Sequence, residues 1–89
     1  PAELAEDGRA LVQDLVDDGR LRRGLGAALD SKLASVLVAI DAGDTATACG
    51  SLRAFNNQVN ALQRSRQIDA ATAAELREAA DALGDALGC

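Results

Sequence analysis

The chain has 89 residues, with 14 acidic and 9 basic side chains, and its net charge at neutral pH is −5. An acidic surface repels phosphate backbones, which argues against nucleic-acid binding as a main role. The sequence has no histidine, so Ser-His-Asp and Cys-His catalysis are excluded. No apolar run approaches the length of a membrane-spanning helix.

The length predicts one domain, residues 1–89. Much of its apolar content is alanine, and Phe55 is the one aromatic residue. Such a small, alanine-rich core is thin and needs reinforcement. The acidic N-terminal residues do not resemble a secretory signal peptide, so we expect a mature fragment or an excised domain.

Two amphipathic helices are predicted in the first half of the chain. In residues 2–17 the apolar stripe consists of Leu4, Gly8, Leu11 and Leu15. Gly19 can end this helix in the left-handed conformation, and residues 20–24 form a connector. A second helix is expected over residues 25–42, where Val38 adds to the apolar stripe and suggests burial on more than one side. Gly43 ends it.

Two more helices are predicted in the second half. Asp44 is suited to cap the third helix, whose apolar positions form a heptad seam: Ala48, Leu52, Phe55, Val59 and Leu62. Residues 64–67 break this pattern and indicate a loop. Asp69 is suited to cap the fourth helix, in which Gly84 is either a close-approach point between helices or a tolerated substitution.

The predicted fold class is all-α. Short connections favour antiparallel neighbours, so we expect an antiparallel helical bundle of three long helices plus an N-terminal helix. No segment alternates with a period of two over more than a few residues, and no strand is predicted.

The topology also predicts a disulfide between the two cysteines. Cys49 lies near the start of the third helix and Cys89 just after the fourth, and antiparallel packing brings a start beside an end. The alternatives are two free thiols or an intermolecular link through Cys89. A lasting disulfide implies an oxidising compartment, so we expect an extracellular, secreted protein.

We predict no catalytic residues, no metal site and no cofactor. Two cysteines without histidine cannot complete a tetrahedral zinc site, and Asp14, Asp17 and Asp18 lack the spacing of a calcium loop. Gly24 and Gly26 lack the lysine and the preceding strand of a phosphate loop and indicate a flexible helix entry.

Five polar residues are candidates for binding. Arg20, Arg22 and Arg23 form a short basic cluster that either pairs with Asp17 or Asp18 or anchors an anionic glycan or a partner. Asn57 and Asn60 belong to an amide-rich run that either offers donors and acceptors to a ligand or is solvated surface. Without tryptophan or tyrosine, a sugar-stacking platform is excluded.

Several segments resemble the FIMAH family of helical modules. They are GLGAALDSKL (24–33), AIDAGD (39–44), LRAFNNQV (52–59), IDAATAAEL (68–76) and the terminal LGC (87–89). The resemblance covers residues 4–89, and its motifs are mostly core and cap residues. One departure is Asn56, where the family usually has isoleucine.

The resemblance implies a noncatalytic accessory domain at the C-terminus of a secreted bacterial enzyme, such as a glycosidase, a polysaccharide lyase or a protease. Its expected partners are the parent enzyme domain or an extracellular protein or polysaccharide. The alternatives are a stand-alone carbohydrate- or protein-binding module and a self-association module that forms a homodimer.

Overall fold

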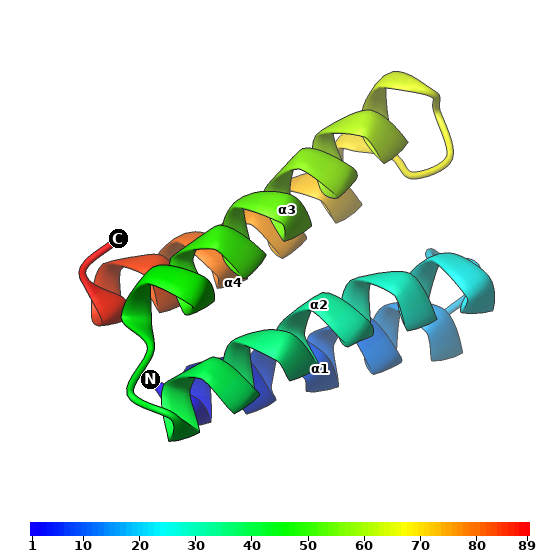
Figure 1. The fold of residues 1–89 in the computed structure, drawn as a ribbon. Helices are drawn as coiled ribbons and strands as arrows, with labels where there is room; N and C mark the ends of the chain where they lie inside the picture. Colours follow the sequence, from blue (N-terminus) through cyan, green and yellow to red (C-terminus); the bar gives the residue numbers. More distant parts are fainter.

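The computed structural model describes all 89 residues and contains four helices of similar length. They are α1 (Ala2–Asp17), α2 (Arg23–Asp41), α3 (Thr45–Arg64) and α4 (Ala70–Leu87). The α1–α2 and α3–α4 connections lie at one end of the bundle, and both termini lie with the α2–α3 connection at the other (Figure 1). This confirms the predicted all-α antiparallel bundle, in which the N-terminal helix is a full member.

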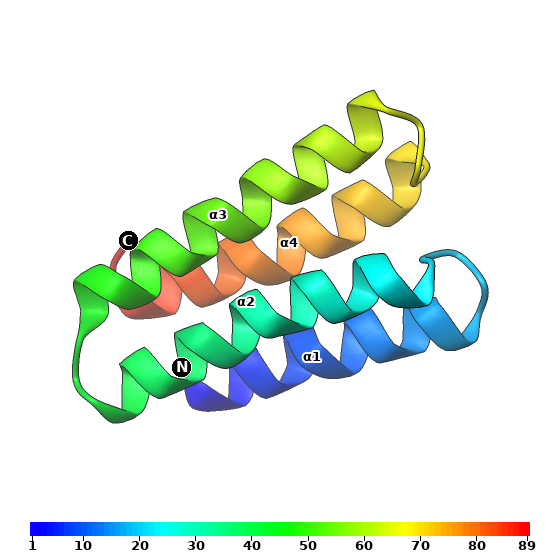
Figure 2. The same cartoon turned by 45° about the vertical axis from the view of Figure 1, so that its right-hand side comes forward.

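The helices form a closed ring in chain order. α1 lies beside α2, and α3 lies beside α4 (Figure 2). α1 also packs against α4 and α2 against α3, whereas helices on a diagonal do not pack directly. Each helix therefore has two neighbours and must bury a face wider than a single stripe. In α1 the buried positions are Ala5, Gly8, Val12 and Leu15, while Leu4 and Leu11 of the predicted stripe are only half-buried.

One core of 18 buried hydrophobic residues runs through the ring. All five positions of the predicted heptad seam in α3 belong to it, and Phe55 is only 1% exposed. The core is built mainly from leucine, valine and alanine, so its packing energy comes from many individually weak contacts.

The helix ends follow from local chemistry. The carboxylate of Asp44 accepts a hydrogen bond from the amide of Thr47 (3.1 Å), and that of Asp69 accepts one from the amide of Thr72 (2.7 Å). Both predicted caps are thus confirmed, because each satisfies an amide that the first turn leaves free. After α1 the backbone turns at Gly19, which has φ +77° as expected of a left-handed helix stop.

The predicted disulfide is present. Cys49 in the first turns of α3 is bonded to Cys89, which follows α4, and the two Cα atoms are 5.7 Å apart. No cysteine remains free. The bond joins residues 40 positions apart and ties the end of the chain to the neighbouring helix.

Two expectations about α2 were wrong. α2 begins at Arg23 and not at residue 25, so the connector is shorter. Val38 is not buried on a second side but is 70% exposed, because the neighbours of α2 cover only its other faces. Of the two alternatives for Gly84 in α4, the structure supports a tolerated substitution, because a β-carbon there would meet Cys89 at 3.8 Å, an ordinary contact.

Close approach occurs instead between α1 and α2. A β-carbon on Gly26 would lie 2.5 Å from Cγ2 of Val16, and one on Gly8 would lie 3.3 Å from Cδ1 of Leu33. Gly26 is therefore a packing position and not only a flexible helix entry.

None of the four helices combines the length and the apolar content that a membrane span requires.

Candidate functional site: the arginine end and the outer face of α2

Arginines gather at one end of the bundle. Two connections meet there, and with the residues that flank them they carry Arg20, Arg22, Arg23, Arg64 and Arg66, which together we call the arginine end. The grouping follows from the antiparallel topology, which places the α1–α2 and α3–α4 connections at the same end of the bundle (Figure 1). The first three were predicted as a basic cluster, whereas Arg64 and Arg66 were predicted only as part of a loop.

Two of these arginines link the connections to the neighbouring helix pair. Nη2 of Arg20 lies 2.7 Å from Oε2 of Glu75 on α4. The guanidinium of Arg22 donates to the side-chain carbonyl of Gln67. The expected pairing of Arg20 with Asp17 or Asp18 was therefore wrong, because α4 brings a carboxylate closer to the guanidinium than its own connection does.

The other three arginines have no ion-pair partner. No carboxylate oxygen lies within 4.0 Å of Arg23, Arg64 or Arg66, and all three are exposed. Arg66 also has a left-handed backbone, with φ +62°, which is uncommon for a residue that is not glycine.

A shallow hollow lies between the two connections. It is lined by Gly19, Arg20, Gln63, Arg66, Gln67, Ile68, Asp69 and Ala70. The carboxylate of Asp69 is occupied by the first turn of α4, and hydrogen bonding from the amide of Thr72 lowers its pKa below the ordinary 3.8. The hollow thus presents guanidinium and carboxamide groups around one engaged carboxylate.

The two candidate asparagines lie along α3, before this end. Asn57 is exposed, whereas Asn60 is half-buried and its side-chain carbonyl accepts from Arg77 of α4 at 3.1 Å. Arg77 also donates to Gln63 at 2.8 Å. Neither asparagine lines the hollow, and a binding role for them stays a prediction.

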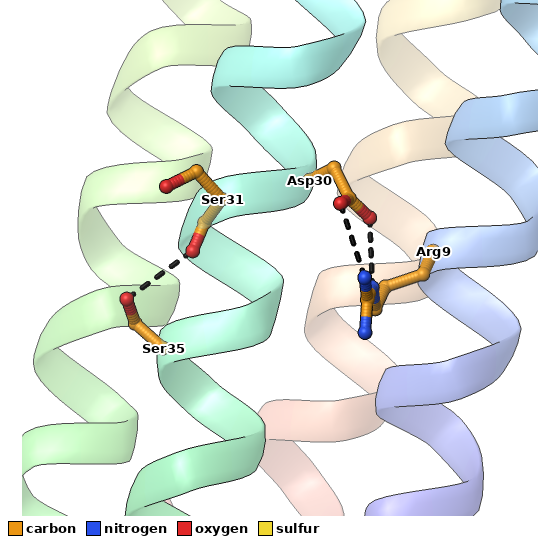
Figure 3. Close-up of polar contacts among 4 residues, drawn as sticks. All are labelled: Arg9, Asp30, Ser31 and Ser35. Carbon is orange, nitrogen blue, oxygen red and sulfur yellow. Dashed lines mark hydrogen bonds and ion pairs between the residues drawn. The ribbon is translucent and has the colours of Figure 1, made fainter.

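A charged groove runs along α1 and α2 beside the arginine end. Nε of Arg9 lies 2.8 Å from Oδ1 of Asp30, and Nη2 of Arg9 lies 3.2 Å from Oδ2, so the ion pair is bidentate (Figure 3). The hydrogen bond from Arg9 to Asp30 and the charge of Asp30 raise the pKa of Arg9. Arg23 and Gly26 also line the groove between α1 and α2.

The outer face of α2 has the opposite character. One stripe of this face carries no charge over more than four turns, and the exposed charges of α2, Arg23 and Asp41, lie outside it. The stripe consists of Gly24, Ala27, Ala28, Ser31, Ala34, Ser35, Val38 and Ala42, of which Ala28 and Ala34 are half-buried. The hydroxyl of Ser35 donates to the backbone carbonyl of Ser31 at 3.2 Å, which satisfies it within the helix (Figure 3). A shallow groove follows this face to the start of α3, where Asp44 and Thr47 close it.

No cluster of three or more carboxylate or thiol groups lies close enough to hold a metal ion. The fold and these surfaces define a small disulfide-closed helical module whose distinctive features are surface patches. Residues 5–85 match the FIMAH domain, and the chain belongs to that family. No curated protein and no solved structure matches the chain.

Proposed function

We propose that the chain is a noncatalytic accessory domain at the C-terminus of a secreted bacterial enzyme, a glycosidase, polysaccharide lyase or protease. Membership of the FIMAH family and the Cys49–Cys89 disulfide support this proposal, since lasting disulfides belong to oxidising compartments. The chain has no histidine, and four of its carboxylates are engaged in caps and ion pairs: Asp44, Asp69, Asp30 and Glu75.

The observation that carries the proposal is the uncharged outer face of α2. About a quarter of the residues in this chain are charged, yet this face exposes alanine, serine and Val38. Depletion of charge is the compositional sign of the centre of a protein interface. Small side chains let another element approach the helix closely, so this face suits packing against a neighbouring domain of the parent enzyme.

The first experiment is to determine the coding sequence on both sides of this segment. The proposal requires a secretion signal and an upstream catalytic domain in the same gene. A gene that encodes this module alone after a signal would overturn the accessory role and favour a stand-alone binding module.

The second experiment tests the docking face in the parent protein. A protease site is placed in the linker before the module, and co-elution of the two pieces is measured after cleavage. Val38→Asp should separate them, whereas Ala74→Asp, at an exposed position of α4, should not. Separation of the wild-type pieces would contradict docking through this face.

Self-association is the second candidate function, and the same face could serve it in a pair of modules. Sedimentation velocity over a hundredfold range of concentration distinguishes the two. A dimer of the isolated chain that Val38→Asp dissociates would assign the face to a second copy.

A further inference from the structure

The charges of this chain are segregated along the bundle. Five of its nine basic residues lie at the arginine end. The opposite end, built from residues 1–8, 38–52 and 78–89, contains no lysine or arginine and holds eight carboxylate side chains. An anionic ligand is therefore repelled by one end of the molecule, whereas the other end offers three arginines without a carboxylate partner.

The unpaired arginines are available for a ligand. Arg20 contacts Glu75 of α4 and Arg22 contacts Gln67 of the α3–α4 connection, so these two guanidinium groups already have partners. Arg23, Arg64 and Arg66 are exposed and have no carboxylate partner. A guanidinium binds carboxylate and sulfate groups through paired hydrogen bonds, which makes arginine the preferred residue for such recognition.

The hollow between the connections adds hydrogen-bonding groups of a second kind. Gln63 and Gln67 lie in it beside Arg20 and Arg66. Their side-chain carbonyls accept from Arg77 and Arg22, and the Gln67 amide donates to Ser65, so the amide of Gln63 is the free donor. Since a carbonyl oxygen can accept a second hydrogen bond, the two glutamines can still donate to and accept from hydroxyl groups, whereas a carboxylate or phosphate alone needs only donors. The combination of guanidinium and carboxamide groups fits a ligand that carries anionic and hydroxyl groups together.

We propose that the arginine end binds an acidic polysaccharide, a polymer whose sugar rings carry carboxylate or sulfate groups. The anionic groups would pair with Arg23, Arg64 and Arg66, and ring hydroxyls would contact the amides of the hollow. Single-stranded nucleic acid fits less well, because the chain offers no exposed aromatic ring on which bases could stack.

The proposal is tested with polygalacturonate as the probe and with its fully methyl-esterified form as the uncharged control. Binding of the 89-residue chain is measured by calorimetry and by retention on the immobilised polymers, at two salt concentrations. We expect binding to polygalacturonate that weakens at high salt, and no binding to the esterified polymer.

Two double variants locate the site. Arg64→Gln with Arg66→Asn removes two free cations from the arginine end, and asparagine suits the left-handed backbone at position 66. Lys32→Gln with Arg53→Gln removes the same charge from the middle of α2 and the first half of α3. The first pair should weaken binding about tenfold or more, the second less than threefold, and neither should change the far-ultraviolet spectrum.

Three results would overturn the proposal. Equal losses in both double variants would mean a general charge effect with no site. Stronger binding to an oligonucleotide than to polygalacturonate would assign the arginines to nucleic acid. Salt-sensitive association of the chain with itself, abolished by the first pair and without polysaccharide binding, would assign them to the acidic end of a second copy. None of these results bears on docking through Val38, which lies elsewhere on the module.

Discussion

Gly26 of α2 faces Val16 of α1 so closely that a β-carbon at Gly26 would lie 2.5 Å from Cγ2 of Val16. Valine is branched at the β-carbon and holds one rotamer in a helix, so it cannot turn away. We predict that Gly26→Ala destabilises the fold by about 1 to 2 kcal/mol, because overpacking outweighs the gain in helix propensity. Urea unfolding measures this.

The matched control is Gly50→Ala in α3, where a β-carbon would meet nothing within 4 Å. This change should stabilise the fold by up to about 1 kcal/mol through helix propensity alone. Combining Val16→Ala with Gly26→Ala should recover part of the loss, since the clash is removed. If Gly26→Ala stabilised the protein as much as Gly50→Ala, the two helices would not be in tight contact at this point.

Removing the disulfide should cost a large part of the stability. The bond closes a loop of 40 residues, and such a crosslink stabilises by about 4 kcal/mol through restriction of the unfolded chain. The variant with Cys49→Ala and Cys89→Ala should therefore unfold at a much lower urea concentration than the wild type.

A reductant should lower the stability of the wild type toward that of the double variant and leave the double variant unchanged. Counting thiols with a maleimide in the denatured, unreduced protein should give none. Two reactive thiols would show that the bond does not form in solution.

The two capping aspartates should make the fold sensitive to acid. The pKa of Asp44 is lowered by hydrogen bonds from the side chain and amide of Thr47, and that of Asp69 by the amide of Thr72. A lowered pKa in the folded state means stabilisation that is complete above the ordinary value of 3.8 and is lost as the pH falls through the lowered values. We therefore expect stability to decrease with acidification in that range.

Replacing both aspartates with asparagine isolates this effect. Asparagine caps a helix about as well as aspartate but does not titrate. The double variant should unfold like the wild type at pH 7 and lose less stability between pH 4 and pH 2. An identical pH profile would contradict a role for these two carboxylates in acid unfolding.

The ion pair between Arg9 and Asp30 should contribute little despite its geometry. Both side chains are more than a third exposed, at 38% and 37%, so water screens the attraction. We expect a coupling of about 0.2 to 1 kcal/mol. A double-mutant cycle with Arg9→Gln and Asp30→Asn at low and high salt measures it. A coupling that did not decrease with salt would indicate a buried, unscreened pair.

Much of the fold could be predicted from local sequence patterns. The heptad seam from Ala48 to Leu62 specifies a helix and its buried face, because residues three and four apart share one side of a helix. Asp44 and Asp69 mark helix starts because a cap and its amide are only three residues apart. Even the Cys49–Cys89 bond followed from sequence, once four antiparallel helices were assumed.

The arginine end could have been predicted in the same way. The topology that brings the two cysteines together also places residues 64–67 beside residues 20–23. The topology that predicts the disulfide therefore also predicts a cluster of arginines. The resulting grouping of Arg64 and Arg66 with Arg20 needed no coordinates.

Other features were decided only by the tertiary structure. Arg20 pairs with Glu75 and not with Asp17 or Asp18, since the rotation of α4 about its own axis sets which carboxylate comes near. Val38 is exposed because the ring leaves one side of α2 without a neighbour. A side chain at position 26 would clash with Val16 because α1 and α2 lie close together there. Sequence periodicity sets which residues share a face of a helix, but only packing sets what that face meets.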